Sequence, residues 1–363
     1  MLNKTNCINA LIVACLAFLT ACNSQAKPNP EGAWTLHYTP KYAGGFRVLI
    51  NADSSLYRII LLNSNNKDTI KDWTTPCLSH PKTVCLSTTH LPMFEAIHAL
   101  DQVVGVGFAH LVKNPLAKAA IADGRILNIN NGDDISKEVM LSLQPDQFLV
   151  YSYGDKDYSS YQTLGIEVIP IAEYLEKTPL GRSEWVVLIG ALSGKLNEAK
   201  TFFQNMEAEY IAIQQSIAFQ KQPSVFTGYY NSGHWYAPPG NSFVAQFLQD
   251  AGARYILKDS LSDQNLVIPF EKMFVSMHSC DYWGKLSFTE DDPTANNFCS
   301  DAPQMKELPS YQTKKLFFCN TQTTDYFGDA IMQPQVILKD LIKIFHPEVD
   351  SLHVPVYFRS VEQ

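Results

Sequence analysis

Val84-Cys85-Leu86-Ser87-Thr88-Thr89-His90, followed by a proline at position 92, is the stretch that decides the fold. Its three apolar residues predict a short buried strand, and the polar residues after them predict a loop. Pro92 suits the first turn of a helix, which we expect to continue to about residue 100. The stretch therefore encodes a strand, a polar loop and a helix in that order.

The same order of elements recurs along the chain. Short apolar strands are predicted at 103–107, 147–151 and 168–171, and a helix at 136–142 begins with Ser136 as its N-cap. A second series starts with a strand at 225–228, followed by a polar and aromatic loop at 229–240, a helix capped by Ser242 that ends at Asp250, and a strand near 255–257. Strands separated by helices pair in parallel, so we expect two similar α/β lobes.

Residues 181–219 contain no proline and are predicted to join the two lobes. After Gly194 the apolar residues recur at three- or four-residue steps, which indicates one long amphipathic helix. These apolar residues are Phe202, Met206, Tyr210, Ile213 and Ile217. Such a helix would connect two domains without an intervening loop; the alternative is a core helix of one large domain.

The N-terminus has the pattern of a bacterial lipoprotein signal. Its apolar run from Ile8 to about Leu19 is shorter than the ~20 residues of a membrane-spanning helix, and Leu19-Thr20-Ala21-Cys22 closes it. We expect cleavage before Cys22, a lipid on its thiol, and a flexible polar tether to about residue 31. An ordinary secretory signal is the alternative, and it too would place the protein outside the cytoplasm.

Alternating apolar residues between positions 34 and 73, with a turn at 51–54, predict a β-hairpin ahead of the lobes. The predicted fold class is therefore α/β, with two Rossmann-like lobes joined by a long backbone helix and preceded by an N-terminal β-hairpin. The segments are a signal peptide (1–21), tether and hairpin (22–75), an N-terminal lobe (76–180), a linking helix region (181–219) and a C-terminal lobe (220–363). Residues 72–77 and the acidic run 290–292 are predicted to be surface loops.

Charge and cysteine usage narrow the possible partners. The net charge is −8 and no basic stripe is present, so we expect no nucleic-acid partner. Three of the eight cysteines fall in the signal or at the lipid site, which leaves an odd number: Cys77, Cys85, Cys280, Cys299 and Cys319. We expect Cys85 to be buried in an apolar run, and Cys280 with Cys299 is a candidate disulfide. No Cys or His spacing resembles a zinc site, so no structural metal is expected.

No enzymatic motif is present in the setting that its chemistry requires. GxSxG, HExxH, GxxxxGKS/T and GxGxxG are all missing from such positions, so we expect neither catalysis nor a cofactor. Two alternatives stay open. One is an extracellular hydrolase with a dispersed His/Asp/Ser set, and the other is a zinc or manganese receptor with three or four His/Asp/Glu ligands, although the chain lacks a His-rich loop.

Several stretches together resemble a known family. They are Leu86-Ser87-Thr88-Thr89-His90, Val103-Val104-Gly105-Val106, Leu143-Gln144-Pro145-Asp146, Leu164-Gly165-Ile166-Glu167-Val168, Pro179-Leu180-Gly181-Arg182-Ser183-Glu184-Trp185, Asp250-Ala251-Gly252-Ala253 and Leu338-Lys339-Asp340-Leu341-Ile342-Lys343-Ile344-Phe345-His346-Pro347. In order and spacing they resemble the substrate-binding lipoproteins of iron-complex and vitamin B12 ABC importers, in the form found in Bacteroidetes-type bacteria. The resemblance covers roughly residues 83–347.

The resemblance implies two α/β lobes on a rigid backbone helix, with a shallow cleft that moves little on ligand binding. It also implies one glutamate on each lobe that docks to arginines of the membrane permease. The matching residues are Glu138 and Glu271. Exposed carboxylates of this kind fix orientation and speed encounter. The alternative for each is a solvated glutamate favoured by the helix dipole.

Ligand-binding residues are expected where loops leave the carboxyl ends of strands. Aromatic side chains in such loops suit flat ligands, although packing between the lobes is an alternative. Thr89 is equally suited to capping a helix, and Arg182 to pairing with Glu184 rather than with an anionic ligand. Isolated histidines are usually not metal ligands. The candidates are Thr88, Thr89, His90, His110, Tyr151, Tyr153, Arg182, Tyr229, Tyr230, His234, Trp235 and Tyr236.

The sequence therefore predicts a lipid-anchored, periplasm-facing binding protein that acts as a monomer. Its expected ligand is an iron chelate (ferric siderophore or haem) or cobalamin, which it delivers to an ABC permease.

Overall fold

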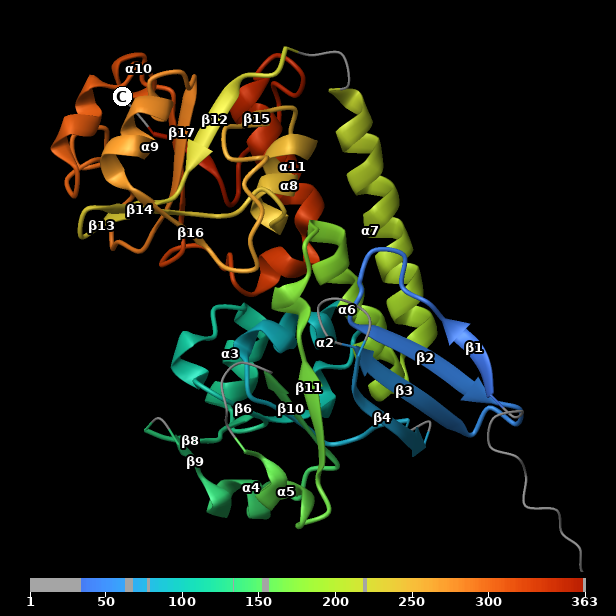
Figure 1. Cartoon of the computed structure of the whole chain (residues 1–363). Coiled ribbons are helices and arrows are strands. Elements are labelled where there is room, and N and C mark those ends of the chain that lie inside the picture. Colours follow the sequence, from blue (N-terminus) through green and yellow to red (C-terminus); the bar gives the residue numbers. More distant parts are fainter. Residues whose placement is uncertain are drawn as a thin grey trace, which may run out of the picture.

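Two α/β lobes lie one above the other in the structure, with a pair of helices and a small antiparallel sheet beside them (Figure 1). The computed structural model describes residues 34–62, 68–76, 79–132, 134–151, 157–217 and 221–361. The predicted signal peptide, Cys22, the tether, Cys77 and Tyr153 lie outside the described residues. The predicted two-lobe α/β architecture is confirmed.

The N-terminal lobe contains a five-stranded sheet in the order β11-β10-β5-β6-β7, in which all neighbouring strands run parallel. Apolar core clusters cover both of its faces, as expected for strands with nearly continuous apolar sequences. The strands are β5 (Thr83–Cys85), β6 (Val103–Val106), β7 (Leu127–Asn128), β10 (Gln147–Tyr151) and β11 (Glu167–Ile171). A two-stranded ribbon, β8 (Asn130–Asn131) with β9 (Asp134–Ile135), extends from it.

Short helices connect these strands. α2 ends at Ala96, short of the predicted end near residue 100, and His98 just after it adopts a left-handed backbone (φ 54°) that a continuing helix does not allow. The N-cap prediction for Ser136 is confirmed, because its Oγ accepts a hydrogen bond from Val139 N at 3.3 Å. The helices are α2 (Leu91–Ala96), α3 (Pro115–Ala122), α4 (Lys137–Leu143) and α5 (Ser159–Gln162), with 3₁₀ turns η1 (Thr88–His90), η2 (Leu100–Gln102), η3 (Ala109–Leu111) and η4 (Glu173–Leu175).

The C-terminal lobe repeats this plan with a sheet in the order β15-β12-β17-β18-β19, in which only β19 runs antiparallel. Ser242 caps α8 as predicted, since its Oγ accepts from Ala245 N at 3.2 Å. The strands are β12 (Ser224–Thr227), β15 (Arg254–Tyr255), β17 (Tyr282–Ser287), β18 (Leu316–Asn320) and β19 (Arg359–Ser360). The helices are α8 (Phe243–Asp250), α9 (Phe270–Met277), α10 (Pro309–Gln312) and α11 (Pro334–Phe345), with η5 (Pro303–Glu307) and η6 (Asp329–Met332).

The predicted loop at 229–240 is wrong, because most of it forms a β-hairpin. Strands β13 (Tyr229–Asn231) and β14 (His234–Ala237) pair antiparallel, and β16 (Leu266–Pro269) adds a third strand. The two residues between β13 and β14, Ser232 and Gly233, both have positive φ (49° and 81°), which matches the twist of a two-residue hairpin turn. The predicted loop at 72–77 is likewise mostly strand, within β4 (Thr69–Pro76).

Two helices form the connection between the lobes, α6 (Pro179–Leu192) and α7 (Leu196–Ser216). Gly194 separates them because its left-handed backbone (φ 70°) ends α6. The predicted amphipathic helix after Gly194 is confirmed as α7, which buries Met206 and Tyr210. At 1.5 Å per residue its 21 residues span about 31 Å, and it runs from beside the N-terminal lobe to the start of the C-terminal lobe (Figure 1).

The N-terminal hairpin is larger than predicted. β2 (Phe46–Asn51) and β3 (Leu56–Leu62) form the expected hairpin, but β1 (Trp34–Tyr38) and β4 extend it to four antiparallel strands packed against α6. Glu184 of α6 is fully buried and accepts hydrogen bonds from Tyr38 OH (2.6 Å) and from the backbone N–H groups of residues 41, 42 and 43 (2.7–2.8 Å). The alternative pair of Arg182 with Glu184 is therefore wrong, since this carboxylate faces the N-terminal sheet.

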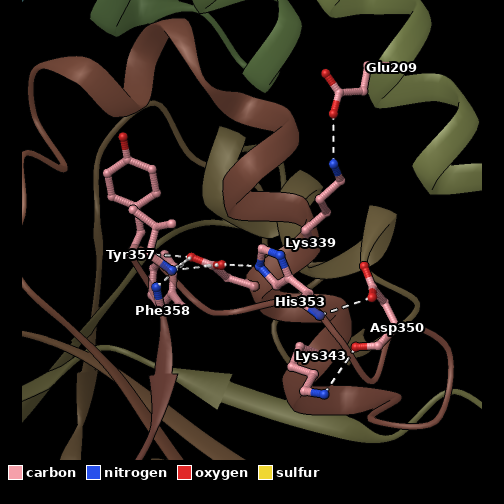
Figure 2. A network of polar contacts seen from close by, with 9 residues as sticks. Glu209, Lys339, Lys343, Asp350, His353, Tyr357 and Phe358 are labelled. Atoms are coloured by element: carbon pink, nitrogen blue, oxygen red, sulfur yellow. Dashed lines mark hydrogen bonds and ion pairs between the residues drawn. The ribbon is translucent and has the colours of Figure 1, made fainter.

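The segment after α11, residues 346–361, packs back against this helix and contains β19. Asp340 of α11 is fully buried, and its carboxylate lies 2.6 Å from His353 Nε2 and accepts hydrogen bonds from the N–H groups of Val356, Tyr357 and Phe358 (Figure 2). These contacts fix the segment on the helix. The neighbouring Lys339 pairs with Glu209 of α7 at 2.7 Å, which connects the C-terminal lobe to the linking helix.

The cysteine prediction is partly wrong. Cys85 is buried as expected, but Cys280 and Cys299 are free thiols within one apolar cluster of the C-terminal lobe. Burial raises the pKa of Cys280 to about 12, which keeps it a neutral thiol. These two residues therefore contribute as small apolar side chains rather than as a disulfide.

Candidate functional site

Each sheet has a point where the strand order reverses, which is where open α/β sheets usually bind ligands, beyond the carboxyl ends of the strands. In the N-terminal lobe the reversal lies between β5 and β10, and in the C-terminal lobe between β12 and β17. The predicted residues Thr88, Thr89 and His90 follow β5, and Tyr151 ends β10. The fold therefore brings these candidates to the reversal point of the N-terminal lobe.

The residues after β5 form a polar and largely buried cluster. Thr89 Oγ1 donates to Glu173 Oε1 at 3.0 Å and lies 2.8 Å from Ser87 Oγ. The capping alternative for Thr89 is wrong, because Ser87 caps η1 by accepting from Thr89 N. Thr88 is partly buried within η1. The hydroxyls are therefore held in place by neighbouring side chains of the same lobe.

His90 and Glu173 carry polar atoms without a partner among the described residues. His90 is fully buried and neither ring nitrogen is hydrogen-bonded, and Glu173 is 2% exposed with Oε2 unbonded. Burial lowers the pKa of His90, and the nearby Glu173 carboxylate acts in the opposite direction. His90 is thus a neutral buried side chain beside a buried carboxylate.

Arg182 lies at the start of α6, between the two lobes. Its guanidinium stands over the Phe243 ring of the C-terminal lobe, 4.5 Å from the ring centre. No ion pair is found for it among the described residues, although Glu173 favours its charge while burial lowers its pKa. A chain of polar and aromatic side chains therefore runs from Thr89 through Glu173 and Arg182 to Phe243.

The C-terminal lobe has a cavity of about 260 Å³ at its own reversal point, which we call the C-lobe cavity. Thr227 and Gly228 follow β12 and Leu286 belongs to β17, so these lining residues come from both strands at the reversal. The remaining lining residues are mainly apolar: Tyr229, Tyr236, Pro238, Ser242, Phe243, Val244, Phe247, Leu248, Asn265, Phe317, Tyr326, Leu341 and Phe358.

The aromatic candidates of the C-terminal lobe separate onto two faces of the hairpin. Tyr229 and Tyr236 line the cavity, and their rings stack with centres 5.2 Å apart. Trp235 does not line the cavity, so its predicted place in the ligand site is wrong. Side chains alternate along a strand, and Trp235 points into the core, where it is 1% exposed. Its indole N–H donates to Thr227 O at 3.1 Å. Tyr230 packs its ring on Phe270 instead.

The candidate histidines other than His90 are exposed and do not line the cavity. His234 is at the tip of the β13–β14 hairpin, where Nδ1 is 3.2 Å from Ser232 O, and His110 is in η3 of the N-terminal lobe. Neither belongs to a metal cluster: no group of three or more His, Cys, Asp or Glu side chains with that arrangement occurs in the part of the chain that the structure describes.

A second hollow of about 610 Å³ lies between α2, α7 and the η6–α11 region. It is more polar than the C-lobe cavity and is lined by three carboxylates, Glu95, Glu209 and Asp329. Asn114 Nδ2 donates to Glu95 and, at 3.0 Å, to Asp329 Oδ1. Since none of the predicted ligand-binding residues lines this hollow, the candidate site is the C-lobe cavity with the polar cluster opposite.

Glu138 and Glu271 occupy equivalent positions in the two lobes. Each is the exposed second residue of a short helix, α4 or α9. Each helix leads into the strand next to the first strand of its lobe, β10 beside β5 and β17 beside β12. Each lobe therefore carries one exposed carboxylate at the equivalent position.

Several cavity residues were not predicted from sequence. Phe243 and Phe247 lie on α8, which was predicted only as a capped helix, while Leu341 and Phe358 come from a part of the chain more than ninety residues further on. The high aromatic content of 12% was the one signal available, and it does not say which rings converge.

Comparison with known proteins agrees with this geometry. The sequence pattern of the family described as periplasmic binding protein matches residues 83–323. The chain belongs to this family. Proteins of this family are solute-binding proteins of ABC transport.

Relatives and solved structures resemble the chain over most of its length. An uncharacterised lipoprotein of Methanocaldococcus jannaschii is 25% identical over 321 residues, 84% of this chain and 75% of the relative. A periplasmic haem-binding protein from Pseudomonas aeruginosa has a TM-score of 0.60 at 15% identity, covering 78% of this chain and 99% of its own.

An ABC-type Fe³⁺-hydroxamate transport protein from Saccharomonospora viridis has a TM-score of 0.57 at 18% identity, covering 76% of this chain and 96% of its own. At these identities the two structures show a shared fold. Within the described ranges, none of the helices has the length and apolar content needed to cross a membrane.

Proposed function

We propose that this periplasmic binding protein captures an iron chelate, either a ferric siderophore or haem, or cobalamin, and delivers it to the permease of an ABC importer. A lipid on Cys22 would hold it at the membrane, facing the periplasm. Family membership carries the proposal, together with the two sheet reversals that supply a polar cluster on one lobe and an apolar cavity on the other. Membership of the Bacteroidetes-type subgroup stays a prediction.

The chemistry of the two faces suits a chelate. Chelates present polar or anionic groups around a metal and carry apolar parts at the periphery, and ligand sites are typically apolar with a few placed polar groups. Thr88, Thr89 and Arg182 supply hydroxyls and a permanent positive charge. Solved structures with this fold include proteins described as binding haem and as transporting ferric hydroxamate, which are ligands of the proposed kind.

Glu138 and Glu271 are the proposed docking points for the permease. Both carboxylates are exposed and no hydrogen bond or ion pair involves them among the described residues, so both remain available to a partner. Two such contacts, one on each lobe, would orient the protein on its permease without involving the ligand site.

The test is tryptophan fluorescence of the mature protein titrated with ferric siderophores, haemin, cobalamin, and free iron, zinc and manganese. Trp235 is a suitable reporter, because it bonds to Thr227 in the cavity wall. Saturable quenching by one chelate at micromolar concentration or below is the expected result, and it should weaken in Trp235→Phe without a change in affinity. A response to a bare ion alone would favour a metal-ion receptor, and silence throughout would refute the proposal.

A further inference from the structure

We propose that the C-lobe cavity binds one uncharged, ring-sized apolar group at the periphery of the ligand. This inference rests on the proposed function and narrows its ligand class. The cavity is lined by aromatic rings from several parts of the lobe: Tyr229 and Tyr236 of the hairpin, Phe243 and Phe247 of α8, Phe317 of β18, Tyr326 after β18, and Phe358 before β19.

The lining excludes a charged group. No Asp, Glu, Lys, Arg or His is among the residues that line the cavity, and its polar side chains are few: Thr227, Ser242 and Asn265, besides the tyrosine hydroxyls. An ion that entered would lose its hydration without gaining a partner, which costs far more than the cavity can return. An apolar group instead gains by leaving water, at roughly 25 cal/mol per Å² of buried surface.

The volume sets the size of that group. An apolar cavity of about 150 Å³ accepts benzene, so 260 Å³ accommodates one substituted ring or two fused rings. Pockets that enclose a whole drug-sized ligand are about 300–1,000 Å³. A tetrapyrrole or corrin macrocycle therefore cannot enter as a whole, and only a peripheral group of the ligand fits.

Arg182 gives the group a direction. Its guanidinium stands over the Phe243 ring, and Phe243, Phe247 and Tyr326 line both the C-lobe cavity and a small hollow of about 20 Å³ that Arg182 also lines. A ligand whose ring fills the cavity would thus place its polar or anionic part toward Arg182 and the N-terminal lobe. The expected ligand is amphiphilic, with an uncharged ring at one end and a charged or chelating part at the other.

The far wall of the cavity comes from the C-terminal segment, beyond the residues that match the family. Leu341 and Phe358 both line the cavity, and the Phe358 ring lies 5.7 Å from Tyr326 and 6.1 Å from Phe317. Asp340 holds this wall, since it accepts hydrogen bonds from three successive N–H groups ending at Phe358 (Figure 2). The C-terminal segment therefore supplies part of the cavity wall.

The first test uses 2-naphthol as an uncharged two-ring probe and 2-naphthalenesulfonate as its charged counterpart. Calorimetry on the mature protein should show saturable 2-naphthol binding with a negative heat-capacity change, the mark of apolar burial, and at least tenfold weaker binding of the sulfonate. Val244→Trp, which fills the cavity from α8, should weaken 2-naphthol binding at least tenfold. Gln249→Trp, on the exposed face of the same helix, is the matched control and should bind normally.

Leu286→Trp fills the mouth of the cavity from a side chain that is 45% exposed, so it provides a second blocking variant if Val244→Trp fails to fold. Binding of 2-naphthol that survives in a folded blocking variant would overturn the inference. So would equal binding of the sulfonate. The chelate panel separates the two proposals: a chelate that binds both wild type and blocked variants equally refutes the ring site alone, whereas 2-naphthol binding without any chelate binding supports the ring site and refutes the proposed function.

Discussion

The two lobes share one plan in strand order and in one exposed helix each, and they differ at the strand reversals, where the proposed ligand site lies. Each lobe places one exposed glutamate at the second position of an equivalent helix, Glu138 in α4 and Glu271 in α9. At the strand reversal, however, the N-terminal lobe presents hydroxyls, a buried carboxylate and a buried histidine, while the C-terminal lobe presents a cavity lined mainly by apolar rings.

Under the proposed function, this difference separates permease docking from ligand binding on one duplicated scaffold. A partner that recognises both lobes in the same way needs the same group on each, and the duplicated helices provide it. A ligand has no such symmetry, and an amphiphilic one is best held between unlike faces. The variants below test each half of the comparison, in order of expected effect.

Reversal of both duplicated charges should have the largest effect. Glu138→Arg with Glu271→Arg is expected to lower uptake of the bound chelate at least about 100-fold, because like charges placed opposite the permease arginines oppose docking. The dissociation constant of the chelate should not change. Transport into cells that depend on this protein measures the first quantity, and fluorescence titration of the purified variant measures the second.

The matched control reverses two other exposed glutamates, Glu290→Arg with Glu307→Arg, and alters the net charge by the same amount. It should leave uptake near wild type. Equal loss of uptake in both double variants, or a loss of chelate affinity in the first, would contradict the docking role.

A charge at the mouth of the apolar face should have the next largest effect. Leu286→Asp is expected to weaken 2-naphthol binding by about 10- to 100-fold, since a carboxylate beside the ring would have to be desolvated. Folding should be little affected because Leu286 is 45% exposed. Leu286→Ala, which removes contact area without adding charge, should cause a smaller loss; if the two variants behave alike, polarity is not what the cavity selects.

Removal of the positive charge opposite should act on a different class of ligand. Arg182→Met keeps an apolar stem over Phe243. It is expected to weaken the binding of anionic chelates by about tenfold, which corresponds to the lower end of the free energy of a hydrogen bond to a charged group. Binding of 2-naphthol should be unchanged. Arg254→Met, at an exposed arginine of the C-terminal lobe, is the control. Parallel losses for chelate and 2-naphthol would show that Arg182 only supports the cavity wall.

The buried histidine of the polar face should give the smallest effect, a pH dependence of stability. Burial lowers the pKa of His90 in the folded protein. At pH values below the ordinary histidine pKa near 6.5, this residue therefore binds more protons in the unfolded state than in the folded state. The free energy of unfolding should therefore fall as the pH drops from 7 toward 5, by up to about 1.4 kcal/mol per pH unit from this residue.

Urea unfolding at several pH values measures this slope. His90→Phe should flatten it, whereas His110→Phe, at an exposed site, should leave it unchanged. An identical slope in His90→Phe and wild type would show that protonation of His90 is not linked to unfolding in this range.

The sequence predicted the elements whose patterns are local. Ser136 and Ser242 were identified as caps from single residues, and α7 from the spacing of its apolar side chains. The run of aromatic residues at 229–240 predicts a loop, whereas residues 229–237 form a hairpin with Ser232-Gly233 as its tight turn. In a strand, successive side chains point to opposite faces, so Trp235 and Tyr236 lie on different faces of the hairpin.

The site could be predicted only in part, because it depends on distant segments. Thr88, Thr89 and His90 are predicted from sequence because they come soon after a strand, and the fold brings them to the reversal point, while their role in ligand binding stays a prediction. Phe317, Leu341 and Phe358 were not, since nothing local connects them to Tyr229, and only the order of strands in the sheet brings them to one cavity.

The attachment of the N-terminal sheet has a consequence for how the protein is made. Glu184 is 141–146 positions along the chain from the groups that it binds, and Glu207 is 165–166 positions from Lys41 and Tyr42. A chain synthesised from its N-terminus therefore produces this sheet early but cannot secure it until α6 and α7 have emerged. Contacts between such distant residues form slowly. This sheet, which is synthesised before either lobe, should thus be among the last elements to become protected, and its apolar face stays accessible to chaperones and proteases until then.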